Sequence, residues 1–151
     1  MSKFSKIVLG LLITSAALII TFRAINQEPT DNLLLDAKVV AIIDNSGCVV
    51  CHGQTRKLPF YSKWPIIGSK IRRDATSAFS SIDLEPSFEA IKTGDLVDDS
   101  VLTRVENVVK DHSMPPLSYT IVRLGSAVSS KEGDIILEWI TLHREKNHKF
   151  Y

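Results

Sequence analysis

Cys48-Val49-Val50-Cys51-His52 is the stretch that decides how this sequence is interpreted. Two thiols three positions apart, followed directly by an imidazole, form the pattern CxxCH, in which both cysteines bond covalently to the vinyl groups of one haem. The histidine then takes one axial position on the haem iron. The sequence therefore predicts one covalently attached haem c, held by Cys48 and Cys51, with His52 as its proximal ligand.

Other interpretations of this motif need features that the chain lacks. A zinc site made of four thiolates needs more cysteines than the two present. A redox-active pair in CxxC is typical of a strand end in a βαβ unit, and no such pattern occurs here. A disulfide and a chance match at three fixed positions are the remaining alternatives. Haem attachment explains both cysteines and the histidine together.

An apolar segment near the amino end indicates export. No charged residue occurs from Ile7 to Phe22, while Lys3 and Lys6 precede this run and Arg23 follows it. Positive residues ahead of an apolar run keep the amino end in the cytoplasm and direct the following chain across the membrane. The run lies between a signal-peptide core of roughly 7–15 residues and a spanning helix of roughly 17–25. Because no Ala-x-Ala cleavage site follows, we favour an anchor over a removed signal sequence for residues 1–23.

The remaining chain is expected to form one domain. A polar linker over residues 24–32 is followed by residues 33–151, about 120 residues, which suffice for one modest core and one haem. This domain is expected to face the periplasm from the bacterial inner membrane. The net charge of +1 identifies no partner, and no nucleic-acid partner is expected because neither a known motif nor a strong positive charge is present.

Helical spacing of apolar residues dominates the predicted haem domain, and no convincing strand pattern occurs. One helix is expected to begin near Thr30 or Asp31 and to end at Gly47, and a shorter one to end at Gly94. Further helices are expected near Pro65, after a cap among residues 98–100, and after the capping box Ser129-x-x-Glu132. Residues 120–124 are β-branched enough to be extended. The predicted class is all-α, a cytochrome-c-like domain with helices near both ends and a loop-rich middle.

The distal iron ligand is predicted from a single methionine. Apart from the initiator, Met114 is the only methionine, and Pro115 and Pro116 hold the backbone after it in an extended path. A thioether on a stiff loop suits the distal position, where it raises the reduction potential relative to a second imidazole. His112 is the rival ligand, and an open distal site would indicate sensing or peroxide chemistry. His143 and His148 are expected on the surface.

Aromatic and charged residues add weaker signals. Tyr61, Trp64 and Tyr119 are candidates for contact with the porphyrin or its propionates, whereas Trp139 is expected to pack in the core. Residues 53–73 carry no acid and six cations, which are Arg56, Lys57, Lys63, Lys70, Arg72 and Arg73. Residues 83–99 carry six acids against Lys92 alone. These stretches are either ordinary solvated surface or a docking face.

Several motifs together resemble a known family. After CxxCH come Leu58-Pro59-x-Tyr61 and Pro65, then Met114-Pro115-Pro116-x-x-Tyr119-Thr120, Val128-Ser129 and Glu138-Trp139-Ile140. In this order they resemble the haem-binding domain at the amino end of membrane-anchored, three-haem bacterial cytochrome c peroxidases, a domain that also occurs alone. The resemblance implies that Cys48 and Cys51 are the thioether anchors, His52 the proximal ligand and Met114 the distal ligand.

The resemblance also implies a function. In that family the domain collects electrons from membrane quinol and passes them to a two-haem peroxidase body. Because the two further CxxCH motifs of that body are absent, we expect no peroxidase activity from this chain alone and assign it no catalytic residue. The expected function is single-electron transfer from quinol or a donor cytochrome to a cytochrome c peroxidase or another periplasmic acceptor. The alternative is a haem-based sensor or small catalytic haem protein with a displaceable distal ligand.

Overall fold

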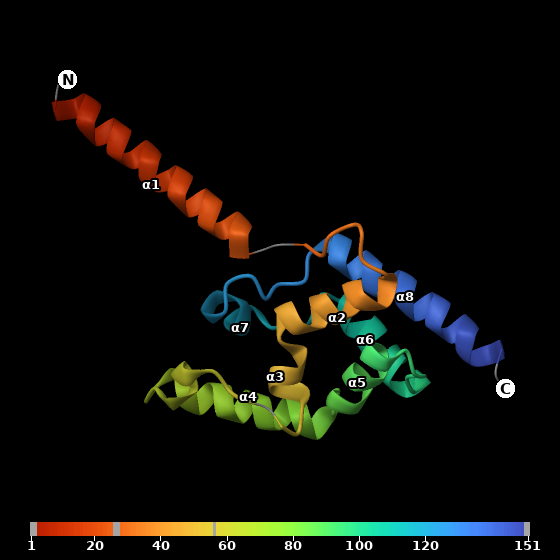
Figure 1. Ribbon diagram of the computed structural model, residues 1–151. Helices are drawn as coiled ribbons and strands as arrows, with labels where there is room; N and C mark the ends of the chain where they lie inside the picture. The colour runs from red at the N-terminus through yellow and green to blue at the C-terminus, as the bar shows by residue number, and fades with distance from the viewer. Residues whose placement is uncertain (1–2, 26–27, 56, 150–151) are drawn as a thin grey trace.

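The structure is a computed structural model that describes residues 3–25, 28–55 and 57–149 (Figure 1). Its described residues form helices and connecting segments, with no strand among them, which confirms the predicted all-α class. In chain order the elements are α1 (Lys3–Ile25), α2 (Leu35–Ser46), α3 (Cys48–His52), the 3-10 helix η1 (Phe60–Lys63), α4 (Ile67–Ser81), α5 (Glu85–Thr93), α6 (Asp99–Lys110), α7 (Leu117–Val122) and α8 (Ser130–Lys149).

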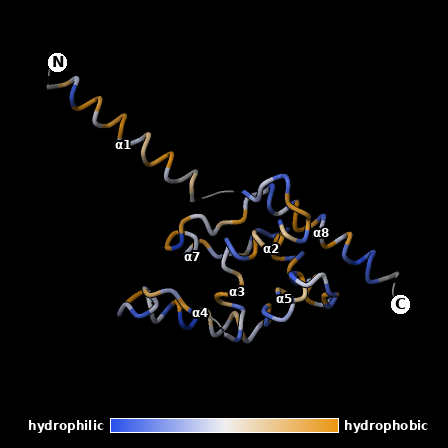
Figure 2. Tube along the Cα trace, viewed as in Figure 1, coloured by the Kyte–Doolittle hydropathy of each residue, from blue (hydrophilic) through white to orange (hydrophobic). Residues whose placement is uncertain are grey.

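Helix α1 stands apart from the rest of the chain and is apolar along most of its length (Figures 1 and 2). Its window Phe4–Thr21 has a mean hydropathy of 2.0, and no other part of the chain covers it. By length and composition α1 is therefore a candidate membrane-spanning helix. Residues 26 and 27 of the predicted linker lie outside the described residues.

The core is formed where α2, α5, α6 and α8 meet. Its buried side chains are Val39, Ile42, Ile91, Val97, Leu102, Ile136, Trp139 and Ile140. Trp139 lies in this core as predicted, and its Nε1–H donates a 2.6 Å hydrogen bond to Oδ1 of Asp36 on α2. Because α2 is fixed by this packing, the segment that follows it, α3, is positioned as well.

Local capping signals set several helix ends as predicted. The side chain of Asp98 accepts a hydrogen bond of 2.8 Å from the N–H of Ser100 at the start of α6. At the start of α8, the N–H of Ser129 donates to Glu132 at 2.8 Å, and the N–H of Glu132 donates to Oγ of Ser129 at 3.2 Å. Gly94 ends α5 with a φ of 76°, in the left-handed region that glycine tolerates. These ends are decided by residues adjacent in sequence.

Three expectations about the elements are wrong in detail. Helix α2 begins at Leu35 because Thr30 to Leu33 form a turn, in which Leu33 N–H bonds to Thr30 O at 3.2 Å. Residues 117–122 are helical instead of extended, and Pro116 precedes them with φ and ψ of −65° and 147°. The helix expected near Pro65 is present as α4, which begins at Ile67, and its 15 residues make the middle of the domain less loop-rich than expected.

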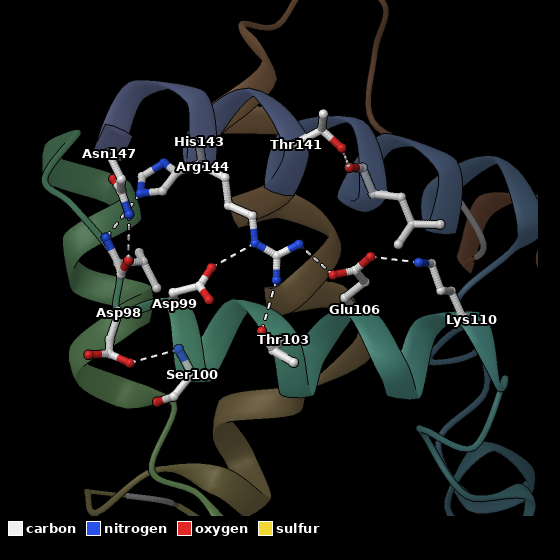
Figure 3. Close-up of polar contacts among 12 residues, drawn as sticks. Asp98, Asp99, Ser100, Thr103, Glu106, Lys110, Thr141, His143, Arg144 and Asn147 are labelled. Carbon is white, nitrogen blue, oxygen red and sulfur yellow. Dashed lines mark hydrogen bonds and ion pairs between the residues drawn. The ribbon is translucent and has the colours of Figure 1, made fainter. Parts of the chain in front are cut away.

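Arg144 joins α8 to α6 through three side chains (Figure 3). Its guanidinium donates to Asp99 at 2.6 Å, to Glu106 at 2.6 Å and to Thr103 at 2.9 Å. Lys110 binds the second oxygen of Glu106 at 2.6 Å. These hydrogen bonds, first from Lys110 and then from Arg144, lower the pKa of Glu106. The network aligns the two helices along one exposed edge of the core.

His143 is buried, contrary to the expectation that it lies on the surface. It is 6% exposed, and its ring lies 4.7 Å from that of Trp139, one helical turn earlier. Nε2 of His143 accepts a hydrogen bond from the N–H of Val97 (Figure 3). Its position four residues after Trp139 is the signal that could have placed it on the apolar face of α8. The side chain of His148 lies outside the described residues.

Candidate functional site

The CxxCH motif forms its own short helix, α3, directly after a sharp turn. Gly47 ends α2 with a φ of 72°, and its N–H bonds to the carbonyls of Ile43 and Asp44 at 3.0 and 3.1 Å. Such a left-handed residue changes the direction of the chain, and glycine adopts it without strain. The turn directs the chain away from α2 and into α3, which packs against α4 (Figure 1).

Cys48 and Cys51 of α3 are thiols, not joined in a disulfide, that are partly accessible and one helical turn apart. Sγ of Cys48 lies 3.1 Å from Oγ of Ser46. Burial raises the pKa of the Cys48 thiol, and this effect is opposed by the Ser46 hydrogen bond and by the charge of Arg123. The thiols therefore sit on one short helix with the geometry that CxxCH requires, and no disulfide joins them.

His52 ends α3 with its ring oriented by a backbone carbonyl. Nδ1 lies 3.3 Å from the carbonyl oxygen of Ile82. Because a carbonyl can only accept, Nδ1 is the donor in this contact, and in the neutral imidazole this arrangement leaves the lone pair of Nε2 for a metal. The carbonyl of His52 in turn accepts a 2.7 Å hydrogen bond from the N–H of Leu84. These two bonds tie His52 to the start of α5.

The loop after His52 is held by one carboxylate. Glu85 accepts hydrogen bonds from the backbone N–H of Thr55, at 2.8 Å, and from its hydroxyl. These bonds, the hydroxyl first, lower the pKa of Glu85. The loop is thereby fixed at the same end of α5 as the His52 carbonyl, so the orientation of α3 depends on contacts with residues 82–85.

Exposed apolar side chains flank α3 on two sides. One group comes from η1 and the start of α4 and contains Phe60, Trp64, Ile66 and Ile67. The other comes from the segment around α7 and contains Leu117, Ile121 and Leu124. In the view of Figure 1, α7 lies above α3 and α4 below it. Flat apolar groups such as a porphyrin bind to surfaces of this kind, so the residues present fit a haem attached at α3.

Met114 lies on the loop between α6 and α7 and is 44% exposed. It lines a cavity of about 230 Å³ together with His112, Pro115, Val109 at the end of α6 and Val128 before α8. The structure thus groups Cys48, Cys51 and His52 on α3, and it places Met114 beside its rival His112 in a cavity whose lining includes none of those three. Which of the two residues acts as distal ligand stays a prediction.

Of the aromatic candidates, Tyr61 and Trp64 lie together, with ring centroids 6.4 Å apart and Phe60 packed against both. Tyr119 on α7 is partly buried, and this burial raises the pKa of its phenol. Contact of Tyr61 or Trp64 with a propionate stays a prediction. Their position on η1 and directly after it places them beside the apolar surface that flanks α3.

The sequence analysis missed Arg123. Its Nη1 donates to the phenolic oxygen of Tyr119 at 3.0 Å, and its Nη2 donates to the carbonyl of Asp44 at 3.2 Å. Both side chains lie directly on Gly47, where a Cβ atom would overlap with them. The available signal was the spacing of four between Tyr119 and Arg123, which places both side chains on one face of a helix.

Comparison with known proteins supports haem binding. The family model of the haem-binding domain matches residues 15–142. Over 107 residues, 71% of this chain, the sequence is 31% identical to cytochrome c peroxidase Ccp of Escherichia coli (strain K12). The chain spans only 23% of the length of that relative. No solved structure matches significantly. The chain belongs to the haem-binding domain family.

Proposed function

We propose that this protein is a monohaem c-type cytochrome that transfers single electrons. Cys48 and Cys51 would hold the haem covalently, with His52 as proximal ligand and Met114 as distal ligand. The observation that carries the proposal is the geometry of α3, in which two thiols one turn apart, not joined in a disulfide, are followed by an imidazole whose Nδ1 faces a backbone carbonyl. A haem held there supplies one-electron exchange between ferrous and ferric iron.

The proposed location is the outer face of the bacterial inner membrane. The support is α1, whose length and hydropathy suit a membrane span, together with the positive residues Lys3 and Lys6 ahead of its apolar run. This orientation places residues 33–151 in the periplasm. The electron donor would then be membrane quinol or a donor cytochrome, since both are within reach of an anchored domain.

The proposed acceptor is a two-haem cytochrome c peroxidase or another periplasmic redox protein. The support is similarity to a cytochrome c peroxidase, of which this chain matches 23%. The chain carries a single CxxCH motif. Peroxide reduction is therefore proposed for a partner and not for this chain.

Only some of the six cations in residues 53–73 are available to form a docking face. Lys70 forms an ion pair with Asp74 at 2.7 Å. Arg72 donates to the carbonyl of Ser62, and Arg56 lies outside the described residues. Lys57, Lys63 and Arg73 are exposed and form no ion pair within the described part of the chain. We propose that these three cations contact an acidic redox partner.

One observation favours the alternative function, a haem sensor or small catalytic haem protein. Met114 is substantially exposed, and it lies on a loop that also carries His112, whose backbone has a φ of 49°. A ligand on an exposed loop is easier to displace than one in a packed helix. A stable bond between Met114 and the iron in both oxidation states would exclude this alternative.

The experiment that tests the proposal uses the full chain, expressed with the bacterial haem-attachment machinery and purified in detergent. Haem staining of a denaturing gel should colour the polypeptide, and a methionine–iron charge-transfer band should appear in the oxidised spectrum. Cys48→Ala and Cys51→Ala should each lose most of the bound haem. Ser46→Ala is the matched control, because it removes the neighbour of the Cys48 thiol but no thioether. Haem that leaves the denatured polypeptide would contradict the proposal.

A further inference from the structure

We propose that Arg123 is a positioning residue, which fixes the segment carrying the predicted distal ligand to the segment that carries the haem. This inference rests on the proposed function, because it assumes a haem attached at α3. It concerns a residue that neither CxxCH nor the methionine loop contains, and its basis is a set of contacts between parts of the chain far apart in sequence.

Arg123 links two segments that lie far apart in the sequence. The hydrogen bond from Nη2 of Arg123 to the carbonyl of Asp44 joins residues 79 positions apart. Asp44 lies in the last turn of α2, and α3 begins four residues later. Arg123 directly follows α7, the short helix that comes after Met114-Pro115-Pro116. A single side chain therefore connects the two segments that would approach the haem from different sides.

The side chain of Arg123 lies directly against Gly47. The guanidinium and the Tyr119 phenol both occupy the space in which any larger residue would place its Cβ atom. The backbone at Gly47 has a positive φ of 72° as well. Glycine is therefore required here both for the turn into α3 and for the close approach of Arg123.

Apart from the bonds of Arg123, α7 is held only weakly. Its side chains Leu117 and Ile121 are 75% and 66% exposed. Its backbone hydrogen bonds run to its own residues, as from Tyr119 to Pro116 and from Arg123 to Tyr119. A short helix with little buried surface opens easily unless a tertiary contact fixes it. The bond from Arg123 is such a contact.

The positive charge of Arg123 also bears on the reduction potential of the haem. Arg123 is half-buried, and within the residues that the structure describes its side chain bonds to a phenol and a carbonyl but to no carboxylate. Its positive charge is therefore not neutralised locally, and it is close enough to oppose the burial effect on the Cys48 pKa. A fixed cation beside a haem disfavours the ferric state, which carries one more positive charge than the ferrous state. Arg123 should therefore raise the reduction potential.

The test compares Arg123→Gln and Arg123→Lys in the full, haem-loaded chain. In Arg123→Gln we expect a weakened methionine–iron band, a lower reduction potential and carbon monoxide binding about tenfold faster than in the wild type, since a charge-assisted hydrogen bond that holds the loop is lost. Arg123→Lys keeps the charge but loses the forked donor. It should restore only the electrostatic part of the potential and leave carbon monoxide binding fast.

Two further variants keep the test decisive. Tyr119→Phe removes the phenolic acceptor and should change the same quantities in the same direction by a smaller amount. Arg104→Gln is the matched control, because Arg104 also donates to a backbone carbonyl, that of Ser81 at 2.9 Å, but is exposed; it should behave as the wild type. If Arg123→Gln fails to fold, Arg123→Lys and Tyr119→Phe carry the comparison.

The outcomes separate the inference from the proposed function. If the wild-type chain binds no covalent haem, the proposed function fails before any variant is compared. The inference fails if the wild type binds haem and Arg123→Gln has the same carbon monoxide binding rate and reduction potential as Arg104→Gln. Arg123 would then not be a positioning residue. Fast carbon monoxide binding with an unchanged potential would overturn the electrostatic step and leave the positioning step in place.

Discussion

The backbone N–H of Val97 donates a hydrogen bond of 2.9 Å to Nε2 of His143, and this bond joins the segment before α6 to the end of α8. The imidazole can accept it only when Nε2 is unprotonated. Burial lowers the pKa of His143, with Lys146 acting in the same direction and Asp36 against it. The folded protein therefore contains a neutral histidine in its core.

The first prediction concerns pH and stability. Because the pKa of His143 is lower in the folded state than its ordinary value of about 6.5, the unfolded state binds more protons as the pH falls. The free energy of unfolding should therefore decrease below about pH 6.5 and be constant, for this group, above it. In His143→Gln this slope should be absent, whereas His112→Gln, which alters an exposed histidine, should retain it. Urea unfolding between pH 5 and 8 measures the effect, and an identical slope in all three proteins would contradict it.

The second prediction concerns Met114. Met114→Ala should abolish the methionine–iron band, lower the reduction potential and allow carbon monoxide or cyanide to bind faster, because the thioether would no longer occupy the distal position. His112→Ala, a change two residues away in the same cavity wall, should leave the band intact. A wild-type low-spin spectrum without the methionine–iron band, lost only in His112→Ala, would identify His112 as the ligand.

The third prediction concerns the proposed docking face. Lys63→Glu and Arg73→Glu should each slow electron transfer to an acidic redox partner by about tenfold at low salt, and the wild-type rate should fall as salt is added. Lys92→Glu reverses a cation outside this stretch and should have little effect. Stopped-flow oxidation by a two-haem peroxidase supplies the measurement. A wild-type rate that is independent of ionic strength would remove these cations from the docking face.

The fourth prediction concerns α1. Its window Phe4–Thr21 has a mean hydropathy of 2.0, so the protein should fractionate with membranes and be released by detergent and not by salt. Added protease should reach the haem domain from the periplasmic side. Sequencing of the mature protein should begin near Met1. A soluble form that begins after Ala24 would show that the segment is a cleaved signal.

The fifth prediction concerns the bridge between α6 and α8. Arg144→Ala should reduce the free energy of unfolding by about 1 kcal/mol. The substitution removes a partly buried network of three hydrogen bonds, which contributes more than a single exposed ion pair. Lys131→Ala breaks an exposed pair with Glu28 and should produce no measurable change. Equal unfolding midpoints for both variants in urea would show that the network contributes little.

The sequence by itself determined the features that depend on neighbouring residues. Haem binding was predicted from Cys48, Cys51 and His52, because covalent attachment would need these three residues only at fixed spacing along one short segment. The ends of α6 and α8 were predictable because Asp98 and the pair Ser129 and Glu132 satisfy backbone groups within three residues. The all-α class follows from the periodicity of the apolar residues.

Only the tertiary structure decided which residues meet across the chain. His143 bonds to Val97 across 46 positions, Arg123 to Asp44 across 79 and Trp139 to Asp36 across 103. It also decided that Lys70 and Arg72 are engaged within the protein, so that fewer of the cations in residues 53–73 remain for a partner. Helical periodicity defines one face of each helix but not the partner of that face, because the crossing of two helices depends on the packing of all their side chains together.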